Sequence, residues 1–140
     1  MDLDKALEWV ADRKVVVLVT LRSDGRPQSS DVLCQRDGDE LLISVTADRA
    51  KTANMRRDPR VVVHASDPGA WSYVSLDGEV TLSPVTTDPT DATSDELVAY
   101  YEAAAGEPHE DWDEYRAAMI AERRQIAHFR PRSAVGQING

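Results

Sequence analysis

Short apolar runs rich in β-branched residues, each followed by turn-forming residues, constrain the fold of this chain more than any other feature. Residues 15–21 (VVVLVTL) are almost continuously apolar, and a turn sequence, SDGRP at 23–27, follows them. Residues 41–45 (LLISV) and 61–65 (VVVHA) have a similar length and composition. This alternation predicts antiparallel strands joined by short connections.

The same reading extended along the chain predicts six strands and flanking helices. Gly78 interrupts the longest strand segment, which predicts a bulge or a close backbone approach, with a tight hairpin as the alternative. We therefore predict one mainly β (α+β) domain, 1–140, with a six-stranded antiparallel sheet closed into a small barrel. The predicted strands are 15–21, 28–34, 41–45, 61–65, 71–82 and 125–138, and the predicted helices are 3–12, 95–105 and 111–123.

Composition excludes several classes of partner. The 140 residues carry 25 acidic and 16 basic side chains, a formal charge of −9, which argues against the broad basic surface that nucleic acids or anionic membranes require. The chain shows neither a signal-peptide pattern nor a long apolar run, so we expect a cytoplasmic protein. The single cysteine, Cys34, cannot form an internal disulfide and is expected to be a small buried side chain.

One segment reverses the acidic balance of the chain. Five of the 16 cationic side chains fall between Arg49 and Arg60, directly after a predicted strand. A helix that begins there would present unpaired N–H groups and a partial positive charge at its start. The segment therefore predicts a local site for an anionic ligand, and a solvated helix surface is the alternative.

The order of several segments resembles a known family. The turn at 24–28, the basic segment 49–60, the stretches 71–73 and 77–79, and the sequence DWDEYR at 111–116 occur in the arrangement of the pyridoxamine 5′-phosphate oxidase-like split β-barrel flavoproteins. Within that family the chain looks most like the small actinobacterial branch that uses the deazaflavin coenzyme F420. The resemblance implies an FMN-binding split barrel and a homodimer with the cofactor cleft at the subunit interface.

The resemblance also implies a set of cofactor-binding residues. The cofactor phosphate would be held at the start of the helix after the third strand, and polar side chains on one face of the second strand would follow the edge of the ring. Two aromatic residues on the fifth strand would stack on the ring or line a substrate pocket. The alternatives for these positions are a helix surface, the solvent face of a strand and ordinary packing. The implied residues are Arg49, Lys51, Thr52, Gln28, Ser30, Trp71 and Tyr73.

Other polar residues near these positions have weaker assignments. Asp31 stands where related proteins often have Asn, so a cofactor contact there is in doubt. Arg56, Arg57 and Arg60 fall where the dipole of a helix favours cations, and the phospholactyl and oligoglutamate groups of F420 offer them a second use.

The function implied is an F420H2-dependent reductase that passes a hydride from the deazaflavin to an unsaturated small molecule. An FMN-dependent oxidoreductase on the same scaffold and a non-catalytic cofactor carrier are the alternatives. True pyridoxamine phosphate oxidase activity is not expected, because the chain is short and its carboxy-terminal segment lacks the arginine-rich substrate pattern. His64, His109 and His128 do not have the spacing of a metal site, and no catalytic side chain is assigned.

Overall fold

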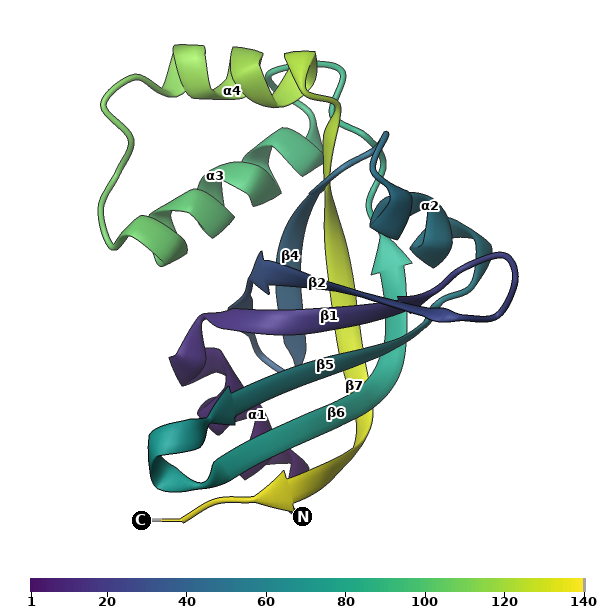
Figure 1. The fold of residues 1–140 in the computed structure, drawn as a ribbon. Coiled ribbons are helices and arrows are strands. Elements are labelled where there is room, and N and C mark those ends of the chain that lie inside the picture. The colour runs from purple at the N-terminus through teal and green to yellow at the C-terminus, as the bar shows by residue number, and fades with distance from the viewer. Residues whose placement is uncertain (140) are drawn as a thin grey trace.

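Seven strands form one antiparallel sheet in the computed structural model, which describes residues 1–139 (Figure 1). The strands are β1 (Val15–Leu21), β2 (Pro27–Leu33), β3 (Gln35–Asp37), β4 (Glu40–Thr46), β5 (Arg60–Asp67), β6 (Ser72–Leu82) and β7 (Arg124–Gln137). Their order across the sheet is β2-β1-β5-β6-β7-β4-β3. The sheet curls into a half-barrel, so the predicted mainly β (α+β) split-barrel class is confirmed.

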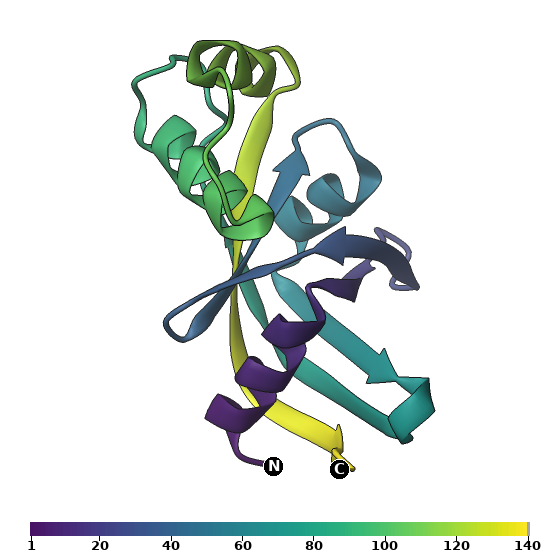
Figure 2. The same cartoon turned by 90° about the vertical axis from the view of Figure 1, so that its left-hand side faces the viewer.

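Four α-helices flank the sheet. They are α1 (Leu3–Arg13), α2 (Ala50–Arg57), α3 (Ala92–Ala105) and α4 (Trp112–Ala121), and a 3₁₀ turn, η1 (Pro68–Ala70), joins β5 to β6. Helices α3 and α4 pack together at the end of the sheet opposite the two termini, whereas α1 lies near the termini (Figure 2). None of the helices within residues 1–139 is long and apolar enough to cross a membrane.

The strand prediction missed one element. The predicted strands leave residues 35–40 as a connection, but Gln35, Arg36 and Asp37 pair with Leu42, Leu41 and Glu40 of β4. Only the tip of this hairpin is a turn, where Gly38 adopts a positive φ of 61°. A strand of three residues is too short to show a period, which is why the expected count of six became seven.

The glycine in the long strand has the predicted role. Strand β6 is continuous and pairs with β7, with an irregular register between Asp77 and Gly78, so the bulge is confirmed and the hairpin alternative was wrong. A Cβ atom on Gly78 would lie 2.2 Å from the backbone oxygen of Arg130. The two backbones therefore approach so closely that only glycine fits.

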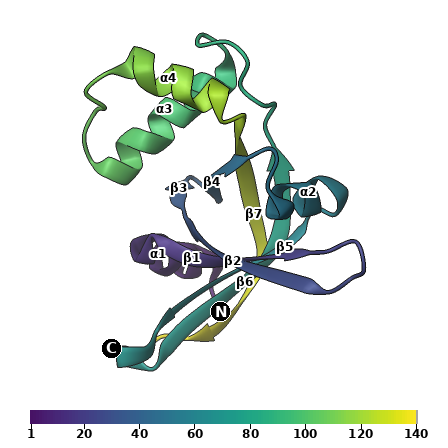
Figure 3. The ribbon, with the colours of Figure 1, turned by 45° about the horizontal axis from the view of Figure 1, so that its top comes forward.

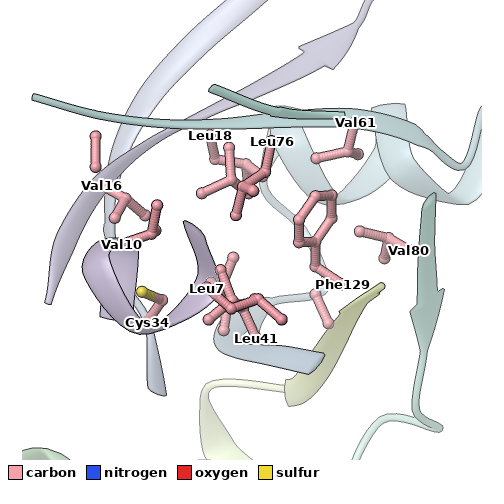
Figure 4. Close-up of a cluster of buried hydrophobic side chains, with 14 of the residues drawn as sticks. Leu7, Val10, Val16, Leu18, Cys34, Leu41, Val61, Leu76, Val80 and Phe129 are labelled. Carbon is pink, nitrogen blue, oxygen red and sulfur yellow. The ribbon is translucent and has the colours of Figure 1, made fainter. Parts of the chain in front are cut away.

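The concave side of the sheet and α1 enclose the main core. Along β1 the side chains alternate, so that Val16 and Leu18 are buried while their neighbours are partly exposed. Leu7 and Val10 of α1 close the cluster against Phe129 of β7 (Figure 4). Fully burying a side chain of this kind stabilises the fold by about 1.5–3 kcal/mol.

Cys34 belongs to this core, as predicted. Its side chain has an exposed fraction of 0%, and burial raises the pKa of the thiol to about 11. The thiol is therefore protonated at neutral pH, and Cys34 acts as a small apolar residue.

Replacing Gly78 tests the close approach of β6 and β7. We expect Gly78→Ala to lower the free energy of unfolding by about 3 kcal/mol, because the atom opposite the new methyl group is backbone and cannot turn away. Urea denaturation followed by circular dichroism measures this. Gly69→Ala is the matched control, since its Cβ would meet only Asp67 at 3.7 Å. Equal stability of the two variants would contradict the proposed contact.

Candidate functional site

A pocket at the amino-terminal end of α2 contains four of the seven residues implied for cofactor binding. The pocket has a volume of about 200 Å³ and its lining residues are Gln28, Ser30, Arg49, Ala50 and Lys51. Arg49 is the N-cap residue of α2, and its exposed side chain makes no capping hydrogen bond. The unpaired N–H groups of the first helical turn and two cationic side chains therefore meet at one pocket.

Strand β2 supplies the polar wall of this pocket. Gln28 and Ser30 lie opposite Thr20 and Leu18 of β1, so both side chains point to the same, inner face of the sheet. The hydroxyl oxygen of Ser30 is buried and has no hydrogen-bond partner within residues 1–139. A buried hydroxyl without a partner is costly, and a polar ligand in the pocket would satisfy it.

The amide of Gln28 is oriented by a buried network that the sequence did not reveal. Arg57 donates to the side-chain oxygen of Asn54 at 2.8 Å, and because arginine can only donate, the Asn54 nitrogen must point the other way. That nitrogen donates to Thr20 Oγ1 at 3.0 Å and to Gln28 Oε1 at 3.1 Å. With its oxygen occupied in this way, Gln28 has its NH₂ group left for a ligand.

Lys51 is close to two other cationic side chains. Partial burial lowers the pKa of its ammonium group, and the nearby charges of Arg49 and Arg124 lower it further. No carboxylate of residues 1–139 forms an ion pair with Lys51 or Arg49. Like charges repel one another, and an anion bound beside Lys51 would relieve this repulsion. The donors present therefore suit a phosphate group.

Thr52 does not face this pocket. Its side chain is 0% exposed, and its hydroxyl donates to the backbone oxygen of Thr46 at 2.7 Å. The one hydroxyl proton is therefore used to fix the loop between β4 and α2. The structure places Thr52 as a support for the helix start and not as a donor to a ligand.

Trp71 and Tyr73 lie at the other end of the sheet. Trp71 follows η1 with a left-handed backbone (φ 52°) and has an exposed fraction of 82%. Tyr73 is 44% exposed and stacks on His64, with the ring centroids 5.8 Å apart. These aromatic residues are separate from the pocket at α2, which is lined only by Gln28, Ser30 and residues 49–51.

The other arginines of the basic segment have structural partners. Arg56 donates to the backbone oxygen of Ala47 at 3.2 Å, and Arg57 donates to that of Leu21 at 3.0 Å. Arg60 pairs with Asp58 through two hydrogen bonds, which lower the pKa of the Asp58 carboxyl to about 2. Arg56 and Arg57 lie in the last turn of α2, as predicted, whereas Arg60 is the first residue of β5 and the prediction of a helix-end role for it was wrong. A second use of these arginines with a longer ligand stays a prediction.

A larger cavity begins on the other side of Lys51. It has a volume of about 520 Å³ and is lined by residues of β2, β4, α3 and α4. Figure 3 shows how these elements are arranged. Lys51 and Asp31 line the cavity together with residues for which the sequence predicted no role in a site. Those residues include Tyr100, Tyr101, His109, Tyr115 and Arg124. They are far apart in the sequence and follow no motif, so no local pattern points to them.

Comparison with known proteins gives one family match. The family model described as pyridoxamine 5′-phosphate oxidase matches residues 3–133. A solved structure described as an F420 reductase is 28% identical, with 91% of this chain and 94% of that chain covered and a TM-score of 0.62.

Two more distant structures share the fold. A conserved hypothetical protein of Mycobacterium tuberculosis is 19% identical over 99% of this chain and 85% of that chain, with a TM-score of 0.78. The haem storage protein HutZ of Vibrio cholerae is 14% identical over 100% and 96%, with a TM-score of 0.67. One architecture is thus common to proteins with different descriptions.

Removing the side chain of Asn54 tests the network behind Gln28. Alanine is the better helix former, so helix propensity alone predicts that Asn54→Ala stabilises the protein. We expect the opposite, a loss of about 1–3 kcal/mol in the free energy of unfolding, because buried partners of Asn54 lose their hydrogen bonds. Urea denaturation measures the sign. Unchanged or increased stability would contradict the network.

Proposed function

Because the chain belongs to the pyridoxamine 5′-phosphate oxidase family, we propose that it binds coenzyme F420 and acts as an F420H2-dependent reductase of an unsaturated small molecule. The observation that carries this proposal is the anion pocket at the start of α2, where Arg49 and Lys51 lack carboxylate partners within residues 1–139. The 28% identity to the F420 reductase, which extends over most of both chains, supports the choice of cofactor.

In this proposal, each group of residues that lines the pocket binds a different part of the cofactor. Arg49, Lys51 and the first N–H groups of α2 bind the cofactor phosphate through charge-assisted hydrogen bonds. The Ser30 hydroxyl and the Gln28 amide bind polar atoms at the edge of the ring. When bound, the reduced deazaflavin supplies the hydride. The chain's own contribution is binding, orientation and a positive environment for the anion.

Proton delivery needs no acidic residue of the small pocket. The side chains that line it include no carboxylate, imidazole or phenol. Solvent or the phenol of Tyr73 from a second subunit is the proton source in this proposal. The lack of an acid in the pocket also fits the first alternative, a cofactor carrier that performs no chemistry. The second alternative, an FMN-dependent enzyme, would use the same phosphate contacts.

Spectroscopy of the purified protein separates these three functions. We expect no co-purified FMN, and F420 binding at micromolar or lower concentration in a fluorescence titration. Reduction of an enone by F420H2 then distinguishes a reductase from a carrier. Co-purified FMN together with weak F420 binding would overturn the proposal in favour of the FMN-dependent enzyme.

Removing the ammonium group at the centre of the site tests the phosphate assignment. We expect Lys51→Ala to weaken F420 binding by about 1.5–3 kcal/mol, roughly 10- to 100-fold, because a charge-assisted hydrogen bond is lost. The fold should persist, since the side chain forms no ion pair within the described chain. Lys5→Ala, on the exposed side of α1, is the charge-matched control. Equal affinity of both variants would refute the assignment.

We further propose that the protein is a homodimer that completes the cofactor cleft. The outer face of the sheet carries exposed apolar side chains, with exposed fractions of 60% for Val15, 37% for Leu33 and 63% for Val135. Trp71 and Tyr73 are also exposed, and Tyr73 pairs with Gln137 at the carboxy-terminal end of β7. A second copy packed on this face would cover the apolar surface and bring the partner subunit's Trp71 and Tyr73 toward the pocket.

Light scattering coupled to size-exclusion chromatography tests the dimer. We expect a mass of two chains for the native protein and of one chain for Val15→Asp, because a charge in the interface opposes association. Ala103→Asp, on an exposed position of α3, should stay dimeric. The monomeric variant should also bind F420 more weakly. A native monomer with full affinity would refute the shared cleft.

A further inference from the structure

The 520 Å³ cavity is larger than a phosphate contact requires and has its own chemistry. It shares Lys51 with the small pocket, so a molecule inside it would lie next to a bound cofactor. Helices α3 and α4 close it from the side opposite α2 (Figures 1 and 3). Its size falls within the range of about 300–1,000 Å³ that is typical of small-molecule sites.

Aromatic rings form one wall of this cavity. Tyr101, His109 and Tyr115 line it, and they pack with Trp112 behind them as one cluster, with ring centroids between 5.1 and 5.8 Å apart. The hydroxyl groups of the buried Tyr115 and of Tyr100 donate to the backbone oxygens of Leu97 and Leu33, each at 2.8 Å. These hydrogen bonds fix the orientation of the Tyr100 and Tyr115 rings and satisfy their hydroxyl donors. The surface left for a ligand is rigid and suited to a flat, conjugated molecule.

Two partly buried cations, Lys51 and Arg124, also line the cavity. Arg124 is the first residue of β7 and lies opposite Thr46, beside the loop that leads into α2. Its Nε and Nη2 groups donate to Glu122, and Nη1 has no hydrogen-bond partner among residues 1–139. The side chain of Arg124 is 29% exposed. Together with Lys51 it offers N–H donors to an anion.

The two carboxylates of the cavity do not cancel these charges. Asp31 and Glu114 also line it, but both residues are exposed, whereas Lys51 and Arg124 are partly buried. Solvent and salt screen exposed charges more strongly than partly buried ones. Glu122 forms an ion pair with Arg124 at 2.9 Å, but it does not line the cavity and leaves Nη1 of Arg124 without a partner in the described chain. An anionic group beside Lys51 and Arg124 is therefore favoured over one beside Asp31 or Glu114.

We propose that this cavity binds a flat, conjugated organic anion, with its ring system on the aromatic wall and its anionic group at Arg124. The identification of this ligand as the substrate rests on the proposed reductase function, since only a bound cofactor next to Lys51 makes the cavity part of an active site. Arg124 is then the residue that selects anionic over neutral substrates.

Nuclear magnetic resonance of the full chain tests the cavity without any reaction. In ¹H–¹⁵N spectra, trans-cinnamate should shift the backbone amides of Tyr101 and Ala118, and the neutral isostere cinnamamide should bind at least about fivefold more weakly. Arg124→Gln should remove this difference between the two probes. Arg132→Gln is the matched control, because it removes one charge from the same strand at an exposed position paired with Glu79.

The outcomes separate the cavity from the cofactor proposal. Equal binding of both probes to the native protein, or cinnamate shifts that avoid the cavity, would overturn the cavity proposal whether or not F420 binds. Loss of cinnamate binding on saturation with F420 would also overturn it, because the cavity would then belong to the cofactor. Cinnamate binding with the predicted Arg124 dependence, in a protein that binds neither F420 nor FMN, would support the cavity and refute the proposed function.

Discussion

The pairing of β7 with both β6 and β4 is the constraint on which the site depends. Strand β7 pairs with β6 along its carboxy-terminal part and with β4 from Arg124 to Phe129, so one strand connects both halves of the curled sheet. The glycine at position 78 lets the β6 and β7 backbones approach closely enough for this curvature. At its start, the Arg123 backbone oxygen accepts a hydrogen bond from the Ala47 backbone N–H at 2.9 Å. The loop that precedes α2 is thereby tied to the sheet.

This connection explains why cations accumulate in a chain with a formal charge of −9. Arg49 and Lys51 lie at the start of α2, and Arg124 lies at the start of β7. The hydrogen bond between Ala47 and Arg123 holds these two segments together, so the three cationic residues come near one another. Partial burial, and then the proximity of Arg49 and Arg124, lower the pKa of Lys51, which opposes folding to a small extent. Local repulsion of this kind is common at functional sites, where a ligand of opposite charge offsets it. The two pockets share Lys51, which couples occupancy of one to the electrostatics of the other.

The sequence was sufficient where the signal was local. β-Branched apolar runs predicted β1, β4 and β5, and extended segments bounded by turn residues predicted the other three of the six longer strands. The interruption at Gly78 predicted the bulge, because glycine chemistry acts within a few residues. The sequence could not predict Asn54, which looks like one polar residue in a basic helix until Thr20 and Gln28 are placed beside it. It also could not show that Thr52 is buried, since its partner is a backbone oxygen six residues earlier in the chain. Arg124 depends on strand order, which is a long-range property.

Strand geometry decides how the aromatic candidates can act. Tyr73 stacks on His64, His64 lies opposite Val17, and Val17 lies opposite Asp31, so all of these side chains lie on one face of the sheet. Ser30 is the neighbour of Asp31 and points to the other face. Because the backbone of the sheet separates its two faces, Tyr73 cannot reach the pocket of its own chain through the sheet. A site that groups these residues, as the resemblance implies, therefore requires a second copy of the chain to supply the aromatic side chains, which is the arrangement of the proposed homodimer.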